Sequence, residues 1–123
     1  MGDIANALSM VNCIPARIKG PDQQAMFEGS PRGIAGTAIL EGAIRQVEMF
    51  RGLIQQEKAG ARLELIGVGG VSTSDDVVRF LAKGALGVQL ATAAMLDPEV
   101  GIRIRKDLAK VAIFGRASSA GRR

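Results

Sequence analysis

Two small-residue turns are the features of this chain best suited to chemistry. Residues 63–76 read as a short apolar strand, the glycine pair Gly69-Gly70 and a polar helix start. A second strand follows at the distance that one helix would occupy, and it ends in the small residues Ala91 and Thr92. The carboxyl ends of consecutive parallel strands meet at one edge of a sheet, where backbone N–H groups can surround a phosphate. The sequence therefore predicts an anion site built from main chain.

The residue types that are missing exclude several kinds of catalysis. The chain has no His and a single Cys, Cys13. It therefore lacks the commonest general base and metal ligand, every Ser–His or Cys–His pair, an internal disulfide and a cysteine zinc site. We expect a cofactor, or residues outside this chain, to carry the chemistry. We also expect Cys13 to be a small buried hydrophobe, and Asp75 and Asp76 to be helix-start charges rather than an acid–base pair.

Composition and charge narrow the class of protein. With 123 residues, 47% hydrophobic and 23% charged, the chain is predicted to be one soluble globular domain. No apolar run reaches membrane-spanning length and no signal peptide is recognisable, so we expect a cytoplasmic protein. The net charge is +4, but residues 101–123 carry +6 and the rest of the chain carries −2. A body near neutrality, with Phe as its only aromatic residue type, argues against nucleic-acid binding.

The predicted elements alternate between strand and helix. Apolar residues at intervals of three and four predict that the first helix buries Leu40, Ala43, Ile44, Val47, Phe50 and Ile54. The second helix is expected to bury Val77, Val78 and Leu81 and to end at Gly84. In chain order we expect a buried strand at 4–13, a long loop at 16–32, a helix at 37–58, a strand at 63–68, a helix beginning at 72–76, a strand at 88–90, and helices at 92–96 and 97–115. This alternation predicts a parallel α/β sheet.

Several motifs resemble the FMN-phosphate region of dihydroorotate dehydrogenases. They are Ile66-Gly-Val-Gly-Gly-Val-Ser72, Asp75-Asp76-Val77, Gly84-Ala85 and Val88-Gln-Leu-Ala-Thr-Ala93. Upstream, Val11-Asn12-Cys13 is similar to the family's Asn-Thr or Asn-Ser at the end of the sixth barrel strand, and Arg32-Gly33-Ile-Ala-Gly36 to its Gly-Gly-Leu-Ser-Gly loop. The Val-Gln-x-x-Thr-Ala piece is specific to that family, whereas the glycine pair is common to many phosphate-binding barrels.

The resemblance implies a cofactor, a substrate and their contacts. FMN would be bound by Gly33, Gly36, Gly69, Gly70, Ala91 and Thr92. Asn12 would hydrogen-bond a pyrimidine substrate, and Cys13 stands beside it where the family has a hydroxyl residue. The implied reaction passes a hydride from dihydroorotate to FMN and forms orotate, a step of pyrimidine biosynthesis.

The family's catalytic base and most of its substrate ligands belong to the first five barrel strands, and this chain begins near the sixth. The implied fold is therefore a partial (βα)₈ TIM barrel, made of about the last three βα units (strands 6–8), over residues 1–115, with a basic flexible tail at 116–123. No residue of this chain is expected to be the catalytic base, so we expect the isolated chain to be inactive. Open sheet edges predict self-association or a complementing N-terminal barrel chain.

Two other interpretations stay open at the level of sequence. One is a different FMN- or phosphate-binding barrel enzyme, similar to dihydropyrimidine dehydrogenase or IMP dehydrogenase. The other is a non-catalytic barrel fragment that complements a partner chain.

Overall fold

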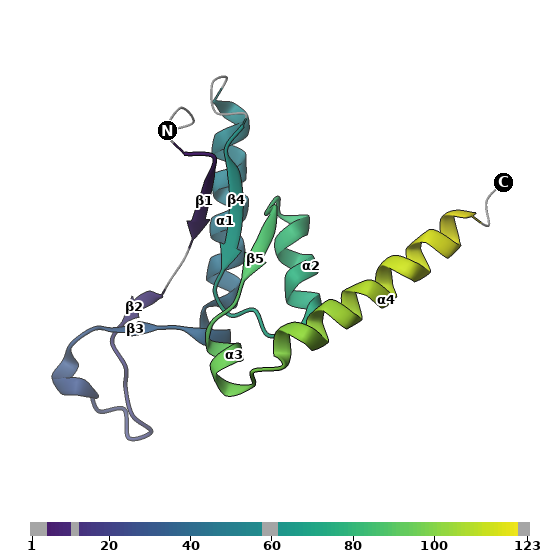
Figure 1. Ribbon diagram of the computed structural model, residues 1–123. Coiled ribbons are helices and arrows are strands. Elements are labelled where there is room, and N and C mark those ends of the chain that lie inside the picture. Colours follow the sequence, from purple (N-terminus) through teal and green to yellow (C-terminus); the bar gives the residue numbers. More distant parts are fainter. Residues whose placement is uncertain (1–4, 11–12, 58–61, 121–123) are drawn as a thin grey trace.

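A three-stranded parallel sheet forms the centre of the molecule (Figure 1). The computed structural model describes residues 5–10, 13–57 and 62–120. The strands β1 (Ala7–Met10), β4 (Glu64–Val68) and β5 (Gly87–Gln89) lie in the order β1-β4-β5. Both strand pairs are parallel, which confirms the predicted parallel sheet. However, β1 is half-exposed along its length, so the prediction of a buried first strand was wrong.

The helix α1 (Leu40–Gln56) packs mainly against β4, as its apolar pattern predicts. It follows directly on a short 3₁₀ helix, η2 (Gly36–Ile39). The buried residues of α1 are Ala43, Ile44, Val47 and Ile54, and Leu40 and Phe50 pack partly buried against the same core. All six positions expected to face the core therefore contact it.

The helix α2 (Ser74–Ala82) packs against β5, but with a different face from the one predicted. Val77 is buried as expected, whereas Val78 and Leu81 are 45% and 43% exposed and Phe80 is fully buried instead. The reason lies in β4, because a Cβ on Gly67 would come within 2.3 Å of the Phe80 ring. The missing side chain leaves the space that the ring occupies. Gly84 follows the helix with φ at 100°, in the C′ position predicted for it.

An antiparallel arm projects from the sheet (Figure 1), and the long loop predicted at 16–32 lies between its two strands. The strand β2 (Ile14–Ala16) pairs with β3 (Arg32–Ile34), and the chain between them includes a 3₁₀ turn, η1 (Phe27–Gly29). Pro15 lies inside β2, opposite Gly33. A strand of a two-stranded sheet tolerates proline because its missing N–H can face away from the partner.

Two helices follow β5 at the carboxyl end of the chain. The short α3 (Thr92–Leu96) begins and ends as predicted, and α4 (Val100–Ala120) continues five residues beyond the expected end at Gly115. The predicted boundary between body and tail at residue 115 therefore falls within α4. The far part of α4 extends away from the sheet (Figure 1).

Candidate functional site

The two turns predicted from the sequence open into one cavity. Its volume is about 510 Å³, and it lies where β4 and β5 end and η2 begins. Because the two strands run parallel, their following turns emerge at the same edge of the sheet. Five of the residues singled out from the sequence line this cavity: Gly36, Gly69, Gly70, Ala91 and Thr92.

At three glycines the wall of the cavity is main chain, because side chains would not fit there. Gly36, Gly69 and Gly70 have φ values of 75°, 123° and 78°, a region that side-chain-bearing residues rarely adopt. A Cβ on Gly70 would lie 2.9 Å from the carbonyl oxygen of Gly36. A Cβ on Gly36 would lie 3.2 Å from Cγ2 of Thr92. The three turns are therefore in contact, and at these glycines an anion would meet peptide groups rather than side chains.

The start of α2 is fixed by a capping box at the side of this cavity. The Asp76 carboxylate accepts hydrogen bonds from the backbone N–H groups of Ser72 and Thr73, at 3.0 and 2.9 Å. In return, the Thr73 hydroxyl accepts from the N–H of Asp76 at 3.2 Å. Burial raises the pKa of Asp76, but the hydrogen bonds from Ser72 and Thr73 outweigh it and hold that pKa below its ordinary value. The prediction that Asp76 belongs to a helix start is confirmed.

Cys13 and Gly33 lie together in the arm and do not line the cavity. A Cβ on Gly33 would come within 2.7 Å of the Cys13 Sγ, so the two residues are in direct contact. The Cys13 side chain is exposed, so the expectation of a buried hydrophobe was wrong. Asn12, the other predicted substrate contact, lies outside the described residues.

A pair of charged residues at the cavity was not predicted from the sequence. Asp97 and Arg103 both line it, and the Arg103 guanidinium donates a hydrogen bond to the Asp97 carboxylate. This ion pair lowers the pKa of Asp97 and raises that of Arg103. The available signal was the spacing, since Arg103 follows the buried Val100 by three residues and so lies on nearly the same side of α4.

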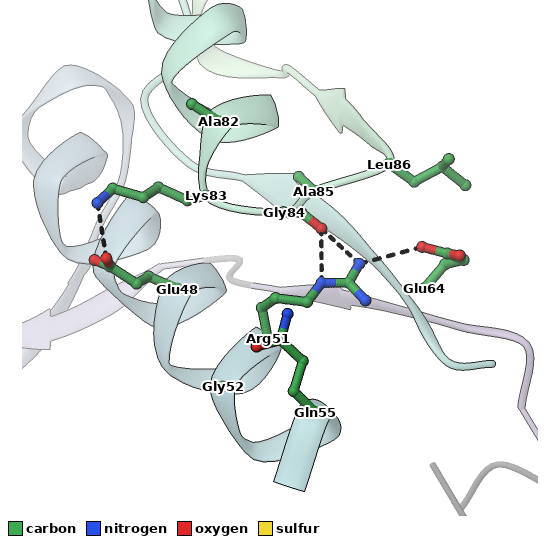
Figure 2. Close-up of a pocket in the computed structure, with 10 residues that line it drawn as sticks. All are labelled: Glu48, Arg51, Gly52, Gln55, Glu64, Ala82, Lys83, Gly84, Ala85 and Leu86. Atoms are coloured by element: carbon green, nitrogen blue, oxygen red, sulfur yellow. Dashed lines mark hydrogen bonds and ion pairs between the residues drawn. The ribbon is translucent and has the colours of Figure 1, made fainter. Parts of the chain in front are cut away.

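A second hollow, of about 770 Å³, lies at the opposite end of the sheet (Figure 2). Its lining includes Glu64 at the start of β4 and Leu86 just before β5. The Arg51 guanidinium donates to the carbonyl oxygen of Gly84 at 2.6 and 3.1 Å and to Glu64 at 3.2 Å (Figure 2). Lys83 and Glu48 pair at 2.7 Å. These contacts link α1 to β4 and to the residues directly after α2.

Two kinds of site are not found among residues 5–10, 13–57 and 62–120. No group of three or more His, Cys, Asp or Glu side chains is arranged to hold a metal ion within these ranges. In the same part of the chain, every helix is too short or too polar to cross a membrane.

Comparison with known proteins identifies the family. The sequence model of the dihydroorotate dehydrogenase family matches residues 3–112. A putative dihydroorotate dehydrogenase A (fumarate) of Solibacter usitatus is 35% identical over 111 aligned positions, and the match covers 86% of this chain and 33% of that protein. The catalytic subunit of dihydroorotate dehydrogenase B (NAD(+)) of Listeria monocytogenes is 33% identical over 107 residues, again 86% of this chain and 33% of the relative.

Similarity to a solved structure supports a fold like that of dihydroorotate dehydrogenases. The crystal structure of DHODH from Eimeria tenella, in complex with ferulenol, superposes with a TM-score of 0.65 at 18% identity. The match covers 92% of this chain and 28% of that one. The chain thus spans about a third of the length of the curated relatives it matches. On these grounds, the chain belongs to the dihydroorotate dehydrogenase family.

Proposed function

We propose that this chain is the C-terminal, FMN-phosphate-binding part of a dihydroorotate dehydrogenase-type (βα)₈ barrel, equivalent to its last three βα units. Family membership and three parallel strands joined through helices support this assignment. The fraction of the relatives that the chain spans, about a third, is also the fraction expected for three of eight units.

The contact between the three small-residue turns is the observation that carries the proposal. Gly36, Gly70 and Thr92 line one cavity. A Cβ added to Gly70 would lie 2.9 Å from the Gly36 carbonyl oxygen, and a Cβ added to Gly36 would lie 3.2 Å from Cγ2 of Thr92. Main-chain donors at the carboxyl ends of barrel strands are the typical phosphate site of this architecture. The main chain at Gly36, Gly69, Gly70, Ala91 and Thr92 therefore forms a cradle that fits the terminal phosphate of FMN.

Bound FMN would accept the hydride that leaves dihydroorotate as orotate forms. In this scheme the chain binds and orients the phosphate end of the cofactor and excludes water from it. Gly33 would let the arm approach the flavin closely, and Asn12 and Cys13 would contact the pyrimidine; the exposed Cys13 thiol is accessible for such a contact. The base that removes the second hydrogen, as a proton, would come from outside this chain.

One face of the three-stranded sheet is uncovered, as expected for part of a barrel. Leu65 of β4 is buried on one face of the sheet. On the other face, the Ser9 hydroxyl of β1 donates a hydrogen bond to Gln89 of β5 at 3.0 Å. This hydrogen bond is exposed. An uncovered sheet face with open edges favours association. We therefore expect self-association or a complementing N-terminal barrel chain, and no dihydroorotate oxidation by the 123-residue chain alone.

Flavin fluorescence titration tests the proposed function. Purified chain is titrated into FMN and, separately, into riboflavin, which lacks the phosphate. We expect FMN to bind at least about tenfold more tightly, equivalent to about 1.4 kcal/mol, with inorganic phosphate competing. Equal affinity for the two flavins would refute the phosphate site, and tighter binding of inosine monophosphate than of FMN would favour an IMP dehydrogenase-like protein.

A further inference from the structure

One cation and one anion line the proposed phosphate cavity within the described part of the chain. The cation is Arg103, in the first turns of α4, and the anion is Asp97, in the link between α3 and α4. The other lining residues are small, apolar or hydroxyl-bearing. Any charge-based selection of a ligand at this cavity therefore depends on this pair.

Asp97 is held in a fixed position by the start of α4. Its Oδ1 accepts a hydrogen bond from the N–H of Glu99 at 3.1 Å, and its carbonyl oxygen accepts from the N–H of Val100 at 3.1 Å. Val100 is buried, which fixes this turn against the core. The remaining carboxylate oxygen, Oδ2, accepts from the Arg103 guanidinium.

The guanidinium keeps donors free for a second anion. An arginine has five N–H donors in a planar fork, and the bond to Asp97 comes from a single terminal nitrogen, Nη2. The Arg103 side chain lines the cavity and is 54% exposed. A phosphate monoester carries about −1.5 to −2 charges near neutral pH, and a guanidinium matches its oxygens in geometry as well as in charge.

A backbone N–H bond to an ionised phosphate oxygen is charge-assisted, and it is stronger than a bond to a neutral hydroxyl or carbonyl oxygen. The main-chain groups themselves carry no net charge, so a guanidinium would add a full positive charge to this preference. We infer that Arg103, positioned by Asp97, contacts the flavin phosphate and selects FMN over riboflavin. This inference rests on the proposed function and adds a specificity-determining side chain to the main-chain cradle.

The test compares Arg103→Gln with a matched control, Arg105→Gln. Arg105 is also exposed on α4 and carries the same charge, but it does not line the cavity. Affinities for FMN and riboflavin are measured by flavin fluorescence at two salt concentrations, and thermal unfolding checks that each variant is folded. A surface ion pair contributes little to stability, so both variants are expected to fold.

We expect Arg103→Gln to weaken FMN binding about tenfold and to leave riboflavin binding unchanged. The salt dependence of FMN binding should also decrease. Arg105→Gln should change FMN affinity less than about twofold. Equal losses in the two variants would indicate general electrostatics and would overturn the role of Arg103.

The two proposals fail in different ways. If the unchanged chain prefers FMN and Arg103→Gln keeps the full preference, the cradle is main chain only and the inference about Arg103 is wrong. If the unchanged chain shows no preference for FMN, the proposed function fails and the role of Arg103 fails with it.

Discussion

Gly70 is the residue at which the geometry of the cavity is most constrained. Its φ is 78°, and a Cβ there would lie 2.8–2.9 Å from Leu40 and from the Gly36 carbonyl oxygen. Gly52, in the middle of α1, has no neighbour within 4 Å of such an atom. The same substitution should therefore have opposite effects at these two positions.

We predict that Gly70→Ala lowers the free energy of unfolding by about 2–4 kcal/mol, from backbone strain and overpacking. Gly52→Ala should raise it by about 0.5–1 kcal/mol, because alanine is the better helix former. Urea denaturation of both variants measures these changes. A Gly70→Ala protein as stable as the unchanged chain would mean that the turn is not held as described.

Asp76 makes the stability of the fold depend on pH. Its pKa is lower in the folded chain than the ordinary 3.8, so its contribution is complete above that value. As the pH falls, the unfolded chain takes up the proton first, and the contribution is lost as the pH passes through the folded pKa. We predict that the stability difference between the unchanged chain and Asp76→Asn narrows between pH 7 and pH 3, as measured by urea denaturation.

The control is Asp75→Asn, which removes a charge from the same helix turn but leaves the capping box intact. Each variant is compared with the unchanged chain for its difference in free energy of unfolding. If this difference narrows equally for Asp75→Asn and Asp76→Asn between pH 7 and pH 3, the effect comes from the helix dipole and not from the capping hydrogen bonds of Asp76.

At the scale of elements, Arg51 joins α1 to the end of α2. It donates two hydrogen bonds to the carbonyl oxygen of Gly84, which follows α2, and the Arg51 side chain is 23% exposed. We predict that Arg51→Ala lowers the free energy of unfolding by about 1–3 kcal/mol, because the Gly84 carbonyl loses a charged donor. FMN affinity, measured where the variant is folded, should stay unchanged; a loss of FMN binding would show that the hollow of Figure 2 is coupled to the cavity.

The elements that the sequence predicted are those specified by local pattern. The core face of α1, the capping residues of α2 and the turns at Gly69-Gly70 and Ala91-Thr92 all depend on neighbouring residues, and the structure confirms each of them. Long-range effects were missed. Phe80 is buried in place of Leu81 because Gly67, thirteen residues earlier, leaves room for its ring.

The strands of the arm and the Asp97–Arg103 pair were also missed, because they too depend on residues far apart in the sequence. Whether Pro15 ends a strand or lies within one depends on its partner strand at 32–34. That Arg103 reaches the cavity depends on how α4 leaves α3, which no local motif specifies. The roles of Gly33, Asn12 and Cys13 stay predictions that come from the resemblance.

At the scale of the whole molecule, the uncovered face of the sheet predicts association. Its outer strands in the described part of the chain are β1 and β5, and both present an open edge. We predict that light scattering coupled to size exclusion gives a mass above the 12.9 kDa of the chain. A single monomeric species across micromolar concentrations would contradict this expectation.

Binding of the phosphate by the three turns can be observed directly at the backbone amides of the cavity. Two-dimensional ¹H–¹⁵N NMR can follow them one by one as FMN or riboflavin is added. We predict that FMN shifts the amide signals of Gly36, Gly69, Gly70, Ala91 and Thr92 more than those of any other group of residues, and that riboflavin leaves these signals almost unchanged. FMN shifts that avoid these five amides, or that riboflavin reproduces in full, would contradict the claim that the three turns bind the phosphate.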